Sequence, residues 1–363
     1  MILCPTLYQT VKQIEGEAML IRQFIKAVAV LLALSPVFSM GQQSGQLEQI
    51  KVHGNSLVGN LSGDNPERDV KVYLPPSYAG SANKRYPVVY LLHGYTDTAN
   101  NWFGLNGNHF VNVPDAVDAA WENDAEEMII VMPDAYTRFK GSMYSNSVAT
   151  GDWESFVAKD LVTYIDANYR TIPERASRGL AGHSMGGYGA MRIGMKYSEA
   201  FSAIYAMSPC CMGANLNPSM EQFASATAVS NDDEIAESDF GTSAMLASAA
   251  VWSPNPDNPP FYIDLPFKDG QLQLDVVARW AANAPLVMVH QYIPQLQSFD
   301  QIYVDAGDND FGIANTVKEL HAIFESNEVE HWSEIYEGDH VNRIHERITE
   351  HLMPMFSEVL ATE

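Results

Sequence analysis

Cysteine is scarce in this chain of 363 residues, which contains only three. Cys4 lies in the N-terminal leader described below, and the other two, Cys210 and Cys211, are neighbours. A bridge between neighbours is strained, because the backbone holds the two side chains apart. The count therefore excludes a disulfide framework, and no second pair lies at zinc-ligand spacing. We expect Cys210 and Cys211 to be free, mostly buried thiols.

Basic residues are also few. The chain has 21 Lys and Arg against 45 Asp and Glu, which gives a formal net charge of −24 at pH 7. A surface this acidic repels nucleic acid and anionic lipids, so we expect neither as a partner. The acidic residues Asp64, Asp69 and 232–234 lack the ligand spacing of known calcium loops. We therefore expect no metal and no cofactor.

Long apolar runs are lacking too. The run 27–34 follows basic residues, is ended by Pro36 and is too short to span a bilayer. A basic start, an apolar middle and small residues after it are typical of a secretory signal. We predict that residues 1–41 are removed and that the protein is secreted or periplasmic, with Met1 and Met19 both open as the start. No later segment is membrane-spanning by its sequence.

Short β-rich runs recur along the rest of the chain. They are 70–74, 86–92, 127–132, 178–182, 201–207, 301–304 and 332–336. Most are uninterrupted, as expected for strands that are covered on both faces. Helical patterns separate them, for example over 156–168. This alternation predicts an α/β domain over 42–363 with a mainly parallel, doubly wound sheet.

One stretch, 212–295, contains no clear strand of the sheet. It is rich in Pro, Asn and Asp and carries several large aromatic residues. We interpret it as a partly helical insertion that caps the site, with Trp252 and Phe261 contacting the substrate. Trp102 is a third candidate for substrate contact. The alternative is that the aromatic residues of the insertion form a small core beneath it.

Gly182-His183-Ser184-Met185-Gly186 fits the pattern G-x-S-x-G. The pattern is weak alone, but here it ends a predicted strand and opens a predicted helix. A serine on such a turn is held exposed in a strained backbone, and the glycines let strand and helix come close. Ser184 is therefore the candidate nucleophile.

A serine hydroxyl needs a base to take its proton, and the base needs a carboxylate to orient it. His340 follows the run 332–336 in a glycine-containing loop, and it is the candidate base. His183 points the wrong way off the turn, and His93 precedes Ser184, against the usual order of serine, acid and histidine. His345 and His351 fall on the final helix and are expected to face solvent.

The acid is sought in the segment 305–310, which follows the run 301–304. Asp305 stands at the strand end and is expected to bind amides of its own turn. Asp308 and Asp310 are both within reach of His340, and we prefer Asp310. The oxyanion of the intermediate needs two amide donors. We expect them to be the backbone N–H groups of Met185 and Tyr95.

The segments LLHGYTDTANNW, DWESFVAKDLVTYIDANYRTIPERASRGLAGHSMGGYGAM, DAGDND and EGDH together resemble the "Putative esterase" family. That family includes esterase D (S-formylglutathione hydrolase), feruloyl and acetylxylan esterases, and mycolyltransferases. The resemblance covers 70–213 and 301–360 and leaves the insertion, and with it the substrate, open. It implies the α/β-hydrolase fold, the last Asp of the pattern 305–310 in the triad, and oxyanion amides at Tyr95 and Met185.

The sequence therefore predicts a serine carboxylesterase that hydrolyses a small-molecule or carbohydrate-linked ester through an acyl-enzyme on Ser184. One alternative is acyl transfer to an alcohol or sugar acceptor, which shares the acyl-enzyme step. Another, of a different class, is a non-catalytic hydrolase-like module that only binds a ligand. The oligomeric state is not predicted.

Overall fold

The structure is a computed structural model, and it describes residues 44–214 and 220–362. The predicted signal segment, 1–41, lies outside the described residues. Among the helices that are described, none combines the length and the apolar character needed to cross a bilayer.

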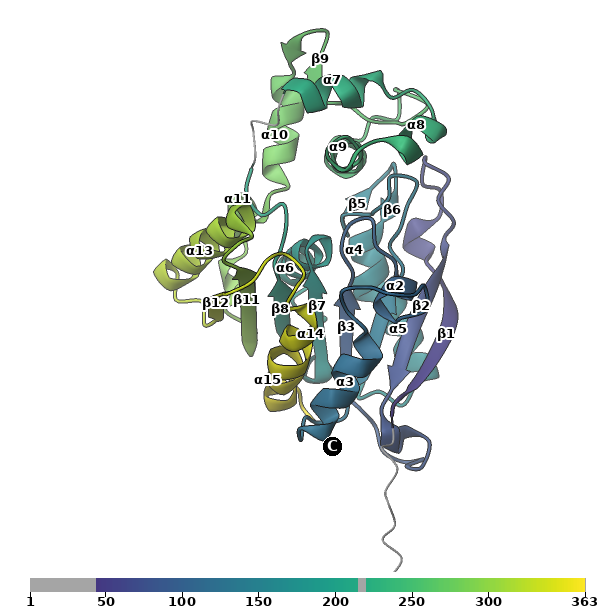
Figure 1. Ribbon diagram of the computed structural model, residues 1–363, viewed down its shortest axis with the longest axis vertical. Helices are drawn as coiled ribbons and strands as arrows, with labels where there is room; N and C mark the ends of the chain where they lie inside the picture. Colours follow the sequence, from purple (N-terminus) through teal and green to yellow (C-terminus); the bar gives the residue numbers. More distant parts are fainter. Residues whose placement is uncertain (1–43, 215–219, 363) are drawn as a thin grey trace, which may run out of the picture. The chain divides into compact units, whose positions relative to one another are not determined.

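An eight-stranded sheet forms the centre of the domain, with the order β1-β2-β4-β3-β7-β8-β11-β12 (Figure 1). Its strands are β1 (Gln46–His53), β2 (Glu67–Leu74), β3 (Val88–Leu92), β4 (Ile129–Pro133), β7 (Arg178–His183), β8 (Ala203–Met207), β11 (Gln301–Gly307) and β12 (Trp332–Tyr336). β2 is antiparallel to both β1 and β4, whereas β4, β3, β7, β8, β11 and β12 pair in parallel. All seven predicted runs fall on strands of this sheet, and only β1 was not predicted.

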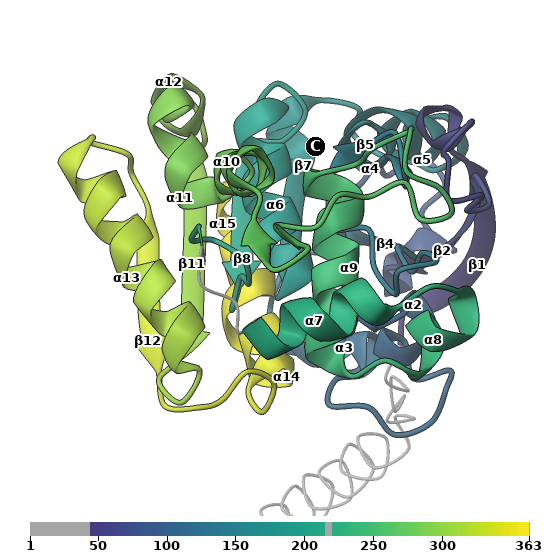
Figure 2. The same cartoon turned by 90° about the horizontal axis from the view of Figure 1, so that it is seen from above.

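Helices cover both faces of the sheet, as a doubly wound fold requires. They are η1 (Asn55–Leu57), η2 (Pro76–Tyr78), α2 (Ala99–Trp102), α3 (Val113–Glu122), α4 (Trp153–Ser155), η3 (Phe156–Leu161), α5 (Val162–Asn168), η4 (Arg175–Ser177), α6 (Met185–Lys196), α11 (Pro285–Met288), η5 (Val289–Gln291), α12 (Ile293–Leu296), α13 (Phe311–Ser326), α14 (Ile344–Glu346), η6 (Arg347–Leu352) and α15 (Met353–Val359). α5, α6 and α13 pack on one face, and α3, η6 and α15 pack on the other (Figure 2). In β3, Val88 and Tyr90 enter the first core and Val89 and Leu91 the second. Burial on both sides explains why this strand is apolar throughout.

The insertion between β8 and β11 forms a helical cap. It contains α7 (Met220–Ala228), α8 (Asp232–Glu237), α9 (Phe240–Trp252), α10 (Leu274–Ala282) and the short hairpin of β9 (Phe267–Lys268) and β10 (Gln271–Leu272). These elements lie together at one end of the sheet (Figures 1 and 2). They share a small apolar core, which includes Ile235, Leu246 and Phe261 of the cap and Phe139 and Ala149 from the segment after β4. Within the described part of the cap, no strand joins the central sheet, as predicted.

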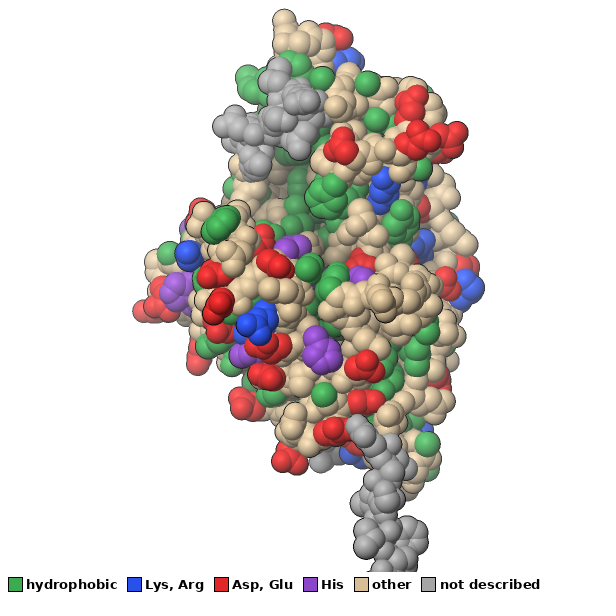
Figure 3. Space-filling view, viewed as in Figure 1, with side chains coloured by type: hydrophobic (Ala, Val, Ile, Leu, Met, Phe, Trp, Pro, Cys, Tyr) green, Lys and Arg blue, Asp and Glu red, His purple; other side chains and the backbone are tan. Residues whose placement is uncertain are grey.

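The excess of acidic residues is visible on the surface. In the view of Figure 3, Asp and Glu side chains are spread more widely than Lys and Arg.

Cys210 and Cys211 are both free, but Cys211 is exposed and Cys210 only partly buried. The prediction of mostly buried thiols is therefore wrong for Cys211, because the chain turns outward there to enter the cap.

Candidate active site

Ser184 occupies the sharp turn between β7 and α6. Its backbone has φ 55° and ψ −114°, a strained conformation for a residue other than glycine. A Cβ on Gly182 would lie 2.3 Å from the carbonyl of Gly186, and one on Gly186 would lie 2.0 Å from the carbonyl oxygen of Leu92. Only glycine fits at these two positions, and this close packing of β7, α6 and β3 fixes Ser184 at the sheet edge.

His340 is hydrogen-bonded to both of its predicted partners. Its Nε2 lies 2.9 Å from Oγ of Ser184, and its Nδ1 lies 2.6 Å from Oδ2 of Asp310. Asp310 follows β11 and begins α13, whereas His340 lies in the loop that follows β12. Because β7, β11 and β12 run parallel, their carboxyl ends bring the three side chains to one edge. An ionised carboxylate such as that of Asp310 can only accept hydrogen bonds, so Nδ1 of His340 carries the proton. Nε2 of His340 is then free to accept the proton of Ser184.

Asp308, the alternative acid, has different partners. Its Oδ1 accepts the backbone N–H of Gly338 at 3.1 Å, two residues before His340. It therefore holds the loop of the base rather than the ring itself.

The prediction that Asp305 binds the amides of its own turn is wrong. It is fully buried and accepts hydrogen bonds from Arg347 and from the hydroxyl of Tyr205. A buried carboxylate needs a charged partner, and the segment 305–310 alone gives no sign of Arg347.

His183 lies against the base and not against the nucleophile. Its Nε2–H donates to the carbonyl of His340 at 2.8 Å, and the two ring centroids are 4.7 Å apart. Complete burial, with a smaller contribution from His340, lowers the pKa of His183 to about 3. His183 is thus a neutral support beneath the loop of His340.

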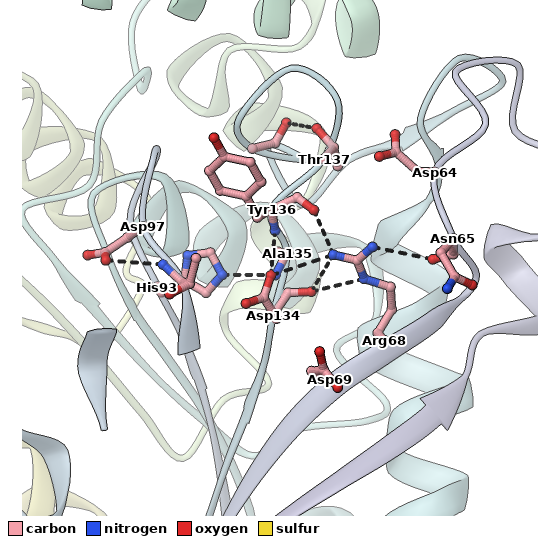
Figure 4. A network of polar contacts seen from close by, with 12 residues as sticks. Asp64, Asn65, Arg68, Asp69, His93, Asp97, Asp134, Ala135, Tyr136 and Thr137 are labelled. Atoms are coloured by element: carbon pink, nitrogen blue, oxygen red, sulfur yellow. Dashed lines mark hydrogen bonds and ion pairs between the residues drawn. The ribbon is translucent and has the colours of Figure 1, made fainter. Parts of the chain in front are cut away.

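His93 connects the loop that contains Tyr95 to the loop after β4. Its Nε2 accepts the backbone N–H of Ala135 at 2.8 Å, and its Nδ1 lies 2.9 Å from the carbonyl of Gly94 (Figure 4). Arg68 supports the second loop by donating to the carbonyls of Asp134 and Tyr136. A network of this kind holds the backbone before Tyr95 in place, and sequence reasoning did not foresee it.

A cavity of about 310 Å³ opens at Ser184. Ser184 and His340 line it together with Gly94, Tyr95, Thr96, Asp97, Asn101, His109, Phe110, His183, Phe240 and Val341. The Nε2 atom of His109 lies 3.0 Å from Oδ2 of Asp97, which makes one wall polar. Phe240, the first residue of α9, is 68% exposed and packs edge-on against Tyr95. Neither His109 nor Phe240 was a predicted site residue, because neither belongs to a recognisable motif.

Trp102 does not line this cavity. It is fully buried, and its indole N–H donates to Oδ2 of Asp97 at 2.7 Å. The prediction that Trp102 contacts the substrate is therefore wrong. The ring supports the loop of Asp97 from behind, because α2 turns it into the core between β3 and α3.

The two aromatic residues predicted from the cap have different surroundings. Trp252 donates to the hydroxyl of Tyr188 at 3.0 Å and lines a largely apolar cavity of about 590 Å³. Trp280, Cys211 and Gly312 line the same cavity. Phe261 is 7% exposed and packs edge-on against Phe139 in the core of the cap. For Phe261 the structure therefore favours the alternative of a small core beneath the insertion.

Some residues that line the 590 Å³ cavity are close in sequence to residues of the triad or to residues that contact it. Cys211 follows Cys210, whose backbone N–H binds the carbonyl of Ser184 at 3.1 Å, and Gly312 is two residues after Asp310. The partly polar cavity contains Ser184 and His340, whereas the larger apolar cavity is lined by residues that are neighbours of the triad in sequence. A polarised serine that opens into a cavity is suited to attack the carbonyl of a bound substrate.

Curated proteins of known name match part of this chain. An esterase of Mycobacterium tuberculosis is 35% identical over 136 residues, which cover 37% of this chain and 27% of that protein. The S-formylglutathione hydrolase of Bos taurus is 30% identical over 159 residues, which cover 39% of this chain and 51% of that protein. The matches thus span about half or less of the length of these relatives.

Solved structures match over more of the chain. A ferulic acid esterase superposes with a TM-score of 0.60 at 23% identity and covers 87% of this chain and 98% of its own. An S-formylglutathione hydrolase from Agrobacterium tumefaciens gives 0.56 at 17% identity, with 88% and 97% covered. The predicted α/β-hydrolase fold is confirmed. The model of the family described as "Putative esterase" matches residues 64–351, and the chain therefore belongs to that family.

Proposed function

We propose that this protein hydrolyses carboxylic esters through an acyl-enzyme on Ser184. The unbroken hydrogen-bond chain from Asp310 through His340 to Ser184 carries this proposal. His340 takes the proton of Ser184 as its Oγ attacks the carbonyl carbon, and then gives that proton to the departing alcohol. In the second half, His340 takes a proton from water, which attacks the acyl carbon and restores the Ser184 hydroxyl.

The oxyanion of each tetrahedral intermediate is stabilised by the backbone N–H groups of Met185 and Tyr95. Met185 is the first residue of α6, where an N–H has no acceptor within its own helix. Tyr95 lines the cavity at Ser184, and its loop is held by His93. A Cβ on Gly141 would lie 2.5 Å from the ring of Tyr95 and 2.8 Å from Sδ of Met185, so a glycine is needed beneath both residues.

We propose that the two cavities hold the two parts of the ester. The apolar cavity beside Trp252 receives the acyl group, and the more polar cavity with His109 and Asp97 receives the alcohol. Hydrolysis is favoured over transfer to another alcohol because the side chain of His340 is 36% exposed, so that water reaches the base. The complete triad geometry speaks against a module that only binds.

Replacing Ser184 by Ala tests the proposal. We expect kcat/KM for p-nitrophenyl butyrate to fall by about 10⁴-fold or more, because triad residues act as a unit. Ser326→Ala, which alters an exposed serine at the end of α13, is the matched control and should keep wild-type turnover. Equal turnover by Ser184→Ala and wild type, with both folded, would contradict the assignment.

A further inference from the structure

A group of potential metal ligands lies at the far end of α13 from the triad. His321 and Glu325 are one helical turn apart on α13, and His331 directly precedes β12. One ligand atom from each lies within 4.8 Å of the other two. Nδ1 of His321 and Nε2 of His331 are 2.8 Å apart. We propose that these three residues bind a zinc-type divalent ion, which ties the last turns of α13 to the start of β12.

The tautomer of His331 suits this role. Its Nδ1 lies 2.8 Å from the carbonyl of Val329, so this nitrogen carries the proton and Nε2 presents a lone pair to His321. A histidine that donates its other N–H to a backbone carbonyl is the usual arrangement in metal sites, since it fixes the ring. Without metal, Nδ1–H of His321 donates to that lone pair. On binding, this proton moves to Nε2 of His321 through solvent, which leaves Nδ1 free to bind the ion.

The backbone around the site is already positioned. The reversal after α13 is held by the N–H of Val329, which donates to the carbonyl of Phe324 at 3.0 Å. Both residues are buried, and the ring of Phe324 packs edge-on against His331 at 5.0 Å. Tetrahedral zinc places its ligand atoms about 3.3 Å apart. The separations of the three ligand atoms are at most 4.8 Å, so they have to change by no more than about 1.5 Å to reach this spacing.

The ligand set selects the class of ion. Two imidazoles and one carboxylate suit zinc and its neighbours in the first transition row, whereas calcium and magnesium prefer oxygen ligands throughout. His321 and Glu325 are exposed, so water can complete the coordination. The net charge of −24 also raises the concentration of cations near the surface. No metal was expected from the sequence, because the acidic residues Asp64, Asp69 and 232–234 lack the spacing of calcium loops; the group of His321, Glu325 and His331 was not considered there.

The position of the site indicates what bound metal would do. Asp310 stands at the N-terminus of α13, and His340 follows β12. A bond between the other end of α13 and the start of β12 fastens together the two elements that hold the acid and the base. The ion takes no part in the reaction itself, because none of its ligands lines the cavity at Ser184. We expect a gain in stability without a change in mechanism.

Thermal unfolding with ZnCl₂ tests the proposal on chelator-treated, dialysed full-length protein. At a concentration of about 100 times Kd, the wild type should gain about 4 °C in Tm. Calorimetric titration should give one tight Zn²⁺ per chain. His331→Ala and His321→Ala should both lose the gain and the tight site. His53→Ala removes an exposed histidine that pairs with Glu67 outside the group, and it should respond as wild type does.

Two results would overturn the proposal. One is an equal gain in Tm for wild type, His321→Ala and His331→Ala, which would place the zinc elsewhere, for example at Cys210 and Cys211. The other is no gain in the wild type. His321 is exposed, so its replacement leaves the fold intact even if His331→Ala does not fold. Ester turnover at 25 °C by metal-free wild type should stay near that of the zinc-loaded protein.

Discussion

Asp308 and Asp310 belong to one short loop but act on different parts of His340. Asp310 binds Nδ1 of the ring, whereas Asp308 binds the backbone of Gly338. The first contact fixes the tautomer and stabilises the charged ring during the reaction. The second only shapes the loop.

Asparagine at each position separates the two roles. Asp310→Asn should lower kcat on p-nitrophenyl butyrate by about 10⁴-fold, because an amide can hold the ring in the wrong tautomer. Asp308→Asn should cost about fivefold at most, because the amide oxygen of asparagine can still accept the N–H of Gly338. Steady-state kinetics on the two variants decides the matter, and the reverse order of effects would make Asp308 the acid.

His183 should make the fold sensitive to acid. Its pKa is about 3 in the folded protein, against about 6.5 when unfolded, so the unfolded state binds the extra proton first. The contribution of neutral His183 to the free energy of unfolding is complete above about pH 6.5. It is lost as pH falls toward 3, by up to about 1.4 kcal/mol per pH unit. His183→Gln can retain a donor to the His340 carbonyl without titrating.

Urea unfolding of wild type and His183→Gln between pH 7 and pH 4 measures this contribution. The free energy of unfolding should fall more steeply with decreasing pH in the wild type. Parallel slopes for the two proteins would show that His183 is not the group responsible.

Among the elements, the strands that build the site were the most predictable. Each of β7, β11 and β12 is a short β-rich run, followed by a glycine-containing loop that bears a reactive residue. β1 was missed because most of its side chains are at least partly exposed and leave little apolar pattern. Trp102 and Phe261 were placed wrongly for another reason. Whether an aromatic ring faces a core or a cavity depends on how α2 or the cap packs, and the local sequence does not contain that information.

The cap makes a prediction about acyl chain length. Trp252→Ala should enlarge the apolar cavity and raise the ratio of kcat/KM for octanoyl over butyryl p-nitrophenyl esters. Phe261→Ala serves as the matched control. It removes a ring from the core of the cap and should lower stability by about 3–5 kcal/mol while the ratio stays unchanged. An early-melting Trp252→Ala with a wild-type ratio would exclude Trp252 from the acyl site.

At the scale of the whole molecule, the fold follows from a sheet whose parallel strands deliver their carboxyl ends to one edge. Ser184, Asp310 and His340 come from distant parts of the chain and meet there, so their order and their position after strands were enough to predict that these segments meet, with Asp308 still open as the acid. His109, Phe240, and the group of His321, Glu325 and His331 were not predictable in this way. His109 lies in a loop, Phe240 lies in the cap, and the last three residues are brought together by the packing of α13 against the start of β12; none of these segments matches a motif.

The most direct test of the account is to identify the residue that reacts with a fluorophosphonate. Mass spectrometry of the labelled protein should find one adduct per chain, on the peptide that contains Ser184. His340→Ala should react far more slowly, because the serine then has no base, and Ser184→Ala should not react. An adduct on any other residue, or no adduct on a wild-type protein that hydrolyses esters, would contradict the assignment of Ser184 as the nucleophile.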